Sequence, residues 1–195
     1  MASFRNMRIM NELKKAALDK SDDMTLSQCN SSDFSKLVGS FKGFENTPYE
    51  EGCYNIEFEL PEDYPHKPPK AKLMTRVWHP NISSVTGYIC LDLLTSEKWI
   101  IALSLKNVMT SIKALLILAQ PDDPQDAVVA SQYMTNKDLF EKTASYWNHV
   151  YAGGPFKEYF NEMNEKVDLL SSKGYTRDEA IHQLSMKNWI VDLAD

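Results

Sequence analysis

Residues 54–60, YNIEFEL, carry the strand pattern that decides how this chain folds. Apolar side chains stand at every second position of this stretch: Tyr54, Ile56, Phe58 and Leu60. The positions between them are polar. Because successive side chains of a strand point to opposite faces, the pattern predicts a strand with one face on a core and the other in solvent.

Shorter strands are predicted on both sides of this stretch, over residues 24–29, 34–41 and 70–76. Turn-forming residues separate them, in ENTP at 45–48 and in PEDYP at 61–65. The pattern therefore predicts an antiparallel meander of four strands.

The stretch YPHKPPK, residues 64–70, interrupts the strand pattern. Pro65, Pro68 and Pro69 have no N–H group to donate to a sheet, so we expect a stiff, exposed loop here. Such a loop offers a surface for recognition by another protein.

Helical patterns flank the strands. Residues 4–18 are amphipathic, and the polar side of this helix is expected in solvent. That polar side consists of Arg5, Arg8, Glu12 and Lys15. After the strands, Ser104 is expected to cap a helix whose buried side continues to Ala119, before Pro121 ends it.

Two further helices are predicted over residues 125–134 and 137–151. Asn136 is the expected N-cap of the second, which Gly153 and Gly154 end. Together with the strands, these helices predict an α+β fold.

The fold is predicted to occupy residues 1–152, followed by a linker at 153–155 that contains Pro155. Residues 156–195 are predicted to form a second, small domain of helices over 156–172, over 176–186 and from Trp189 onward. Its expected core is Val167, Leu170, Ala180, Ile181, Leu184, Trp189 and Leu193.

Composition excludes several classes of protein. Hydrophobic residues make up 43% and charged residues 25%, which is typical of a chain that folds unaided. A formal net charge of −6 leaves no excess of Lys and Arg to neutralise phosphates, so nucleic acid is not an expected partner. Because we find no apolar stretch of signal-peptide or membrane-spanning length, we expect no membrane partner and a location in the cytoplasm, with the nucleus also open.

Cysteines and histidines do not suggest a metal site. The chain has 3 Cys and 4 His, without a C-x-x-C pair or histidines spaced to share a metal. We therefore predict no metal and no cofactor. Cys29 and Cys53 fall in strand patterns and are expected to be core thiols.

Cys90 lies in WHPNISSVTGYICLDLL, residues 78–94, and two interpretations of it stay open. Its neighbours Ile89 and Leu91 suit a core thiol. Alternatively, cysteine is the best nucleophile for acyl transfer at neutral pH, even with an ordinary thiol pKa near ~8.5.

Three other residues are considered as helpers for such chemistry: Asn81, His79 and Asp123. The amide of Asn81 could stabilise an oxyanion, although it could equally hold the turn through hydrogen bonds to the backbone. His79, between Trp78 and Pro80, is expected to be structural rather than a base. Asp123 sits in an acidic turn that the sequence alone does not bring near Cys90.

Four stretches together resemble ubiquitin-conjugating enzymes: RIMNEL at 8–13, residues 39–69, residues 78–94, and PDDPQDAVVASQY at 121–133. The strongest single element is His-Pro-Asn followed at this spacing by Cys-Leu-Asp. The resemblance implies that residues 1–152 are a catalytic domain that accepts ubiquitin from an activating enzyme as a thioester. It also implies transfer to a lysine of a protein substrate or of another ubiquitin.

Roles for particular residues follow from the resemblance. Cys90 would be the acceptor, and Asp123 would orient or deprotonate the incoming lysine. Asn81 would stabilise the oxyanion, order the loop, or do both, whereas His79 and Pro80 would be structural. ATP is consumed by the activating enzyme, so the resemblance adds no cofactor to this chain.

Surfaces for the activating enzyme and for ubiquitin ligases also follow from the resemblance. They correspond here to Arg8, Pro65, His66, Lys67, Ile100, Ile101 and Ala102. Many relatives have Phe where His66 stands, and Ser-Pro-Ala in place of residues 100–102. Because large apolar anchors dominate interface energy, the identity of the ligase is left open.

The stretch LLSSKGYTRDEAIHQLSMKNW, residues 169–189, resembles a ubiquitin-associated domain. Such a domain follows the catalytic one in a subgroup of class II conjugating enzymes that build ubiquitin chains. The Met-Gly-Phe that usually contributes to its ubiquitin-binding patch is Lys173-Gly174-Tyr175 here. Binding of ubiquitin and packing against the catalytic domain are therefore two alternative roles.

Two other classes compete with a conjugating enzyme. A non-catalytic ubiquitin-binding adaptor on the same scaffold would typically lack Cys90. A cysteine hydrolase would need a histidine base beside the thiol, and His149 and His182 lie in unfavourable contexts for that role.

Overall fold

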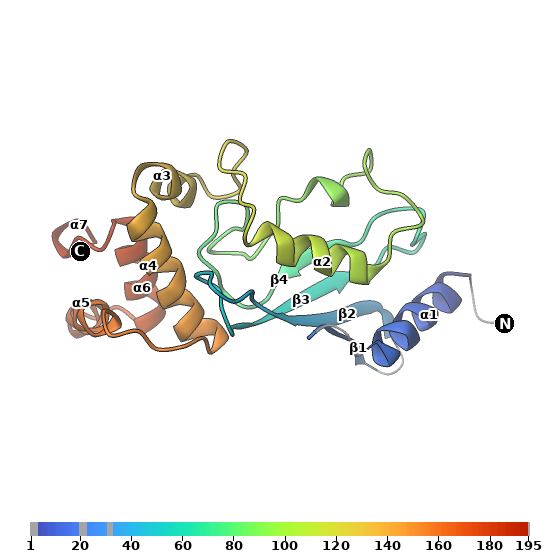
Figure 1. The fold of residues 1–195 in the computed structure, drawn as a ribbon, viewed down its shortest axis with the longest axis horizontal. Coiled ribbons are helices and arrows are strands. Elements are labelled where there is room, and N and C mark those ends of the chain that lie inside the picture. Colours follow the sequence, from blue (N-terminus) through green and yellow to red (C-terminus); the bar gives the residue numbers. More distant parts are fainter. Residues whose placement is uncertain (1–3, 20–22, 31–32, 195) are drawn as a thin grey trace.

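The structure is a computed structural model that describes residues 4–19, 23–30 and 33–194. Helix α1 (Phe4–Leu18) precedes four strands, and helices follow them to the end of the described chain. The strands are β1 (Thr25–Asn30), β2 (Asp33–Lys42), β3 (Cys53–Glu59) and β4 (Lys70–Leu73). The helices after them are α2 (Leu105–Leu115), α3 (Ala127–Thr135), α4 (Lys137–Trp147), α5 (Phe160–Ser172), α6 (Arg177–Met186) and α7 (Val191–Ala194). This arrangement confirms the predicted α+β fold (Figure 1).

The sheet is the predicted antiparallel meander, with strand order β1-β2-β3-β4. Tyr54, Ile56 and Phe58 of β3 are fully buried, as their alternation predicts. Helix α2 lies over one face of the sheet (Figure 1). Gly39 allows that contact, because a Cβ atom on it would stand 2.7 Å from Met109 Sδ of α2. The core therefore lies between the sheet and α2.

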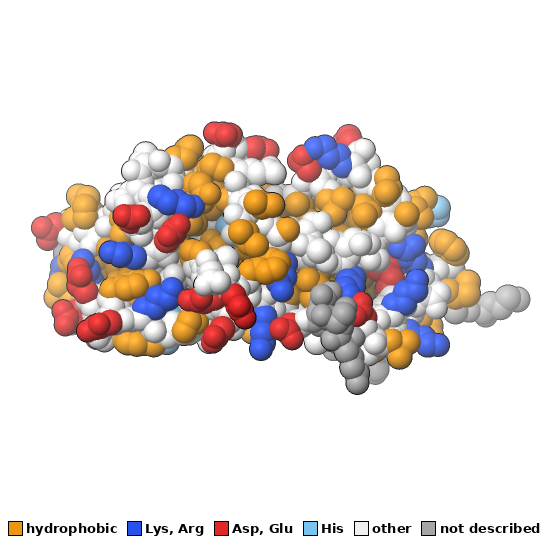
Figure 2. Space-filling model, in the orientation of Figure 1, with side chains coloured by type: hydrophobic (Ala, Val, Ile, Leu, Met, Phe, Trp, Pro, Cys, Tyr) orange, Lys and Arg blue, Asp and Glu red, His pale blue; other side chains and the backbone are white. Residues whose placement is uncertain are grey.

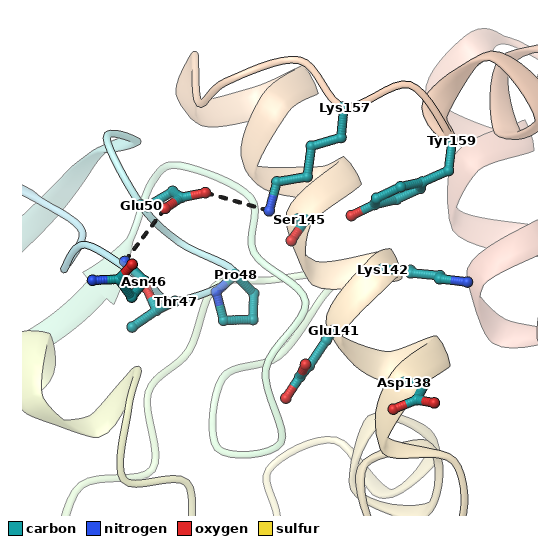
Figure 3. A pocket seen from close by; sticks show the side chains of 10 residues that line it. All are labelled: Asn46, Thr47, Pro48, Glu50, Asp138, Glu141, Lys142, Ser145, Lys157 and Tyr159. Atoms are coloured by element: carbon teal, nitrogen blue, oxygen red, sulfur yellow. Dashed lines mark hydrogen bonds and ion pairs between the residues drawn. The ribbon is translucent and has the colours of Figure 1, made fainter.

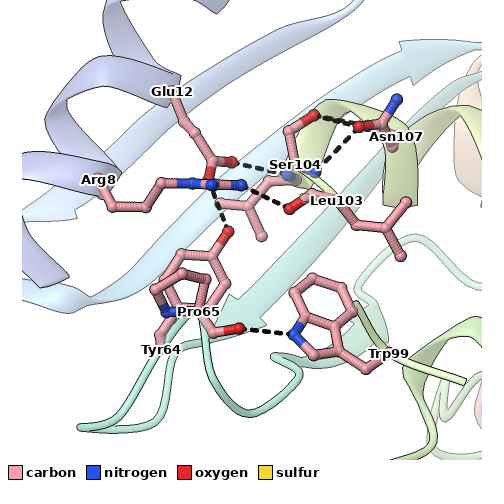
Figure 4. Close-up of polar contacts among 9 residues, drawn as sticks. Arg8, Glu12, Tyr64, Pro65, Trp99, Leu103, Ser104 and Asn107 are labelled. Carbon is pink, nitrogen blue, oxygen red and sulfur yellow. Dashed lines mark hydrogen bonds and ion pairs between the residues drawn. The ribbon is translucent and has the colours of Figure 1, made fainter. Parts of the chain in front are cut away.

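Helix α1 departs from prediction on its polar side, because Glu12 is buried rather than in solvent. Its carboxylate accepts hydrogen bonds from Tyr64 Oη and from the backbone N–H of Leu105, both at 2.7 Å, and pairs with Arg8 Nε at 2.5 Å (Figure 4). Arg8 also donates to the backbone carbonyl of Leu103. Arg8 and Glu12 thus attach the helix to the start of α2.

Replacing Glu12 with alanine is expected to lower the free energy of unfolding by about 3 kcal/mol, because it removes the buried acceptor that three groups share. Urea denaturation followed by tryptophan fluorescence measures this. Lys14→Ala, at an exposed position of the same helix, should change the value by less than about 0.5 kcal/mol. Equal effects of the two substitutions would contradict the assignment.

The proline-rich loop is less exposed than predicted. Pro65 and Pro69 are buried, and the carbonyl oxygen of Pro65 accepts a hydrogen bond from Trp99 Nε1 at 2.8 Å (Figure 4). His66 and Lys67 are exposed. The expectation of an exposed loop is therefore wrong for Pro65, because the indole of Trp99 needs a buried acceptor and holds the loop against the core.

Both cysteines of the sheet are exposed, so the expectation that Cys29 and Cys53 are core thiols is wrong. They occupy positions of β1 and β3 whose side chains point away from the core, as Lys42 does beside Cys53. Cysteine is tolerated on either face of a strand. Which face it occupies depends on whether it falls in step with the buried apolar residues or between them.

The helices after the sheet follow the predicted caps more closely than the predicted ends. Ser104 begins α2 with a capping box to Asn107, and Asn136 caps α4. However, α2 ends at Leu115, four residues before the predicted limit, and Ile117 and Leu118 are exposed. Likewise α5 begins at Phe160 rather than at residue 156.

Helices α5 and α6 and the turn that follows α6 pack against α4 (Figure 1). Trp147 Nε1 of α4 donates to Ser185 Oγ of α6 at 2.8 Å, and Trp189 Nε1 donates to Thr143 Oγ1 at 2.9 Å. Most of the predicted core residues are buried here, but Leu193 is 58% exposed, which corrects that part of the prediction. The hydrogen bonds of Trp147 and Trp189 join the helices on either side of residues 153–155. The division of the chain into two domains at this point stays a prediction.

A hollow of about 550 Å³ marks the junction of the loop before β3, α4 and the segment that leads to α5 (Figure 3). An ion pair between Glu50 and Lys157, 3.3 Å apart, spans one side of it. In the described part of the chain, no helix combines the length and apolar character needed to cross a membrane. Within the same ranges, we find no cluster of His, Cys, Asp and Glu side chains that could hold a metal.

Candidate active site

Cys90 lies at the end of a tight loop that follows β4. A bridge between Ile82 and Ile89 closes this loop, and the backbone N–H of Cys90 donates to the carbonyl of Asn81 at 2.9 Å. Gly87, with φ of 73°, accepts a hydrogen bond from Leu73 N. The side chain of Cys90 is half-buried, so the sulfur is accessible rather than sealed in the core.

The side chain of Asn81 is buried and fully engaged with the segment that leads to α3. Its Nδ2 donates to the carbonyls of Gln120 and Asp123, at 2.8 and 3.0 Å, and its Oδ1 accepts from Gln120 N at 2.8 Å. Both N–H bonds of the amide are therefore used by the backbone. Of the two roles expected for Asn81, this geometry favours ordering of the loop.

His79 is fully buried, and its Nδ1 accepts a hydrogen bond from Asn81 N at 3.1 Å. Burial lowers the pKa of His79 to about 3. The imidazole is neutral at physiological pH and points away from solvent. The next residue, Pro80, accepts hydrogen bonds through its carbonyl from Gln125 N and Asp126 N, both at 2.9 Å.

The carboxylate of Asp123 is exposed and lies within electrostatic range of Cys90. Burial raises the pKa of the Cys90 thiol, and the negative charges of Asp123 and Asp92 raise it further. Both effects disfavour the thiolate. The site therefore keeps Cys90 protonated at neutral pH. The exposed carboxylate of Asp123 could bind an incoming cation such as the ammonium group of a lysine.

Two residues of the site did not emerge from the sequence. Ser84, with 2% of its surface exposed, donates from Oγ to Asp126 Oδ2 at 2.6 Å. Asp126 also caps α3, because its Oδ1 accepts from Val129 N. The N-cap preference for Asp is a local signal that points to Asp126, whereas nothing local marks Ser84.

The residues expected to contact partner proteins divide into two groups. His66, Lys67, Ile100, Ile101 and Ala102 are exposed. Arg8 and Pro65 are held within the fold as described above. On the face drawn in Figure 2, positive and negative side chains alternate, with hydrophobic side chains between them.

Lys173, Gly174 and Tyr175 form the turn between α5 and α6 and border a shallow hollow of about 460 Å³ with Glu179 and Gln183. Gly174 has φ of 105°, a conformation that favours glycine. Lys173 and Gly174 are exposed and Tyr175 is half-buried. The turn is accessible while the C-terminal helices pack against α4.

Comparison with known proteins decides the family. The ubiquitin-conjugating enzyme family model matches residues 8–148. The chain belongs to the ubiquitin-conjugating enzymes. Members of this family carry ubiquitin as a thioester on a cysteine, receive it from an activating enzyme and work with ubiquitin ligases.

Two relatives extend the match over the whole enzyme. Ubiquitin-conjugating enzyme E2 K of Homo sapiens is 44% identical over 198 residues, which cover 100% of this chain and 96% of that protein. Ubiquitin-conjugating enzyme E2-22 kDa of Drosophila melanogaster is 42% identical over 200 residues, which cover 100% of this chain and 97% of the relative. The conjugating enzyme thus has a C-terminal ubiquitin-associated domain.

A solved structure matches the conjugating fold. The structure of a putative ubiquitin conjugating enzyme from Plasmodium yoelii is 45% identical, with a TM-score of 0.74. The match covers 80% of this enzyme and 99% of that chain. The helix, meander and C-terminal helices of the catalytic part are therefore those of the family.

Proposed function

We propose that Cys90 is the cysteine on which this conjugating enzyme carries ubiquitin, and that the enzyme builds ubiquitin chains on protein substrates. The single observation that carries the proposal is that the partly exposed Cys90 lies within electrostatic range of the exposed carboxylate of Asp123. In loading, the sulfur attacks the thioester carbonyl on the activating enzyme. Cys90 loses its proton as the new C–S bond forms, the C–S bond of the old thioester breaks, and the activating enzyme's cysteine leaves as a thiolate that takes up a proton in turn.

Transfer to lysine is the more demanding step, because an amine with an ordinary pKa near ~10.4 is mostly protonated at neutral pH. The lysine nitrogen loses one proton and attacks the thioester carbonyl, a C–N bond forms, the C–S bond breaks, and the thiolate of Cys90 that leaves takes up the second proton of the nitrogen. We assign to Asp123 the orientation of the incoming ammonium and acceptance of its proton. Asn81 holds the backbone that carries Asp123.

An oxyanion role for Asn81 is the alternative assignment. It requires Nδ2 to leave the carbonyl of Gln120 or of Asp123 during the reaction. His79 has no catalytic role in either assignment, because its neutral ring is buried.

Incubation of the full chain with activating enzyme, ATP and ubiquitin tests the function. We expect an adduct that a reducing agent removes, and none in the Cys90→Ala variant. Cys90→Ser is expected to form an oxyester that resists the reducing agent. No adduct on the unaltered chain would favour a non-catalytic adaptor, and cleavage of added ubiquitin chains would favour a hydrolase.

Contacts with partners remain part of the proposal. We assign the activating enzyme and the ligases to the exposed residues His66, Lys67, Ile100, Ile101 and Ala102, beside α1. We assign the turn Lys173-Gly174-Tyr175 to ubiquitin. Support for the second assignment is that the turn stays accessible while other faces of the C-terminal helices contact α4.

A further inference from the structure

A buried serine connects the active-site loop to the C-terminal helices. Ser84 lies between Asn81 and Cys90 in the sequence, and its hydroxyl oxygen is 2.6 Å from Asp126 Oδ2 and 3.4 Å from His182 Nε2. His182 belongs to α6, so the contact joins residues 98 positions apart. A buried polar group needs hydrogen-bond partners, and Asp126 and His182 supply them for the hydroxyl of Ser84.

The direction of these hydrogen bonds follows from chemistry. An ionised carboxylate only accepts, so the hydroxyl of Ser84 donates its single hydrogen to Asp126. The oxygen of Ser84 then accepts from His182, which places the proton of the neutral imidazole on Nε2.

The surroundings of His182 keep the ring neutral. Burial lowers its pKa, the nearby cation Arg76 lowers it further, and Asp126 acts in the opposite direction. The ring of Trp147 lies 6.2 Å from the imidazole, centroid to centroid. Arg76 is itself held over the rings of Trp147 and Tyr151.

Asp126 links the contact between Ser84 and His182 to the segment that bears Asp123. Its backbone N–H donates to the carbonyl of Pro80, and Asn81 holds the carbonyl of Asp123. The segment 123–126 is thus fixed at one end by Asn81 and at the other by Ser84 and Pro80. His182 is the partner in this set that comes from the C-terminal domain.

We propose that His182 is a positioning residue for the transfer of ubiquitin from Cys90 to lysine. Its N–H holds Ser84 and, through Asp126, the segment that carries Asp123. The C-terminal domain thereby acts on the transfer step of its own catalytic domain, in addition to any contact with ubiquitin. This inference rests on the proposed roles of Cys90 and Asp123.

A single-turnover experiment on the full chain tests the proposal. Cys90 is loaded with ubiquitin, ATP is removed, and discharge is followed after addition of free lysine at several concentrations. We expect His182→Leu to lower the discharge rate at saturating lysine by about fivefold, which corresponds to the loss of one hydrogen bond. Loading and the unfolding temperature should stay close to those of the unaltered chain.

Three further variants separate positioning from packing. His182→Gln retains a side-chain N–H and should restore most of the discharge rate. Ser84→Ala, which also removes the hydrogen bond to Asp126, should slow discharge at least as much as His182→Leu, and the double variant should be no slower than Ser84→Ala alone. Asp178→Asn, which alters the ion pair of Arg76 elsewhere on α6, should leave discharge unchanged.

Unchanged discharge in His182→Leu would overturn the proposal. Equal slowing in His182→Leu, His182→Gln and Asp178→Asn would overturn it as well, because packing of α6 and not the hydrogen bond would then matter. Failure of the unaltered chain to load ubiquitin on Cys90 would instead refute the proposed function, and the loading measurement reports this separately.

Discussion

Asn81→Ala is expected to slow the transfer of ubiquitin from Cys90 to lysine by about 100-fold, while loading changes by less than about threefold. The substitution removes three hydrogen bonds that hold Gln120 and Asp123. Loading depends on the sulfur, and alanine retains the backbone carbonyl that holds Cys90 N. The two steps should therefore separate.

Loading and single-turnover discharge to free lysine measure the two rates. Thr86→Ala, at an exposed position of the same loop, is the matched control and should change neither rate. Amide hydrogen exchange distinguishes the two roles of Asn81, because loss of loop order should speed exchange at Gln120 and Asp123. Equal slowing of loading and discharge would refute the assignment.

Asp123→Asn is expected to move two observables in opposite directions. Discharge to lysine should fall by about 100-fold, at the lower end of the range for a group that handles a proton, since Asp123 is exposed. Alkylation of the free enzyme's thiol should become faster at neutral pH. A nearby negative charge disfavours the thiolate and raises the pKa of Cys90, so its removal lowers that pKa.

Iodoacetamide modification between pH 6.5 and 9.5 and single-turnover discharge measure the two effects. The midpoint of the alkylation profile should shift to lower pH in the variant. Asp92→Asn is the matched control, because Asp92 also raises the pKa of Cys90 and pairs with Lys98. We expect it to speed alkylation without slowing discharge. A drop in discharge equal to that of Asp123→Asn would indicate a general electrostatic effect.

Elements set by neighbouring residues could be predicted from the sequence. The alternation at 54–60 determines β3, and the caps Ser104 and Asn136 determine where α2 and α4 begin. The strand alternation and the helix caps involve residues close together in the sequence, so they can be recognised without knowledge of the fold. Helix ends were less accurate, as at Leu115, because packing decides how far a helix continues.

Features set by distant partners could not be predicted. Glu12 is typical of an exposed helix position, yet Leu105, on α2, supplies the N–H that makes its burial favourable. Pro65 is buried through Trp99 in the same way. Trp189 packs on α4, whereas Leu193, four residues later, is exposed.

In the candidate site, too, local motifs could be predicted from the sequence and contacts between distant residues could not. Cys90 and Asn81 share one motif, so a resemblance was sufficient to select them, and Asp123 came from a second motif. Their proximity required the structure, because hydrogen bonds from Asn81 bring the acidic turn to the loop. Ser84 and His182 lie 98 positions apart, and no local pattern connects them.

The tryptophans at the junction of α4 and α6 affect how a shortened form of this enzyme should be interpreted. A chain ending at residue 152 would present Trp147 to water and leave Thr143 without the indole that it binds. Lower activity or poor solubility of such a truncated protein would then report an uncovered apolar surface, and not the absence of a ubiquitin receptor. Point substitutions in the turn 173–175 avoid this ambiguity, since they leave both indoles covered.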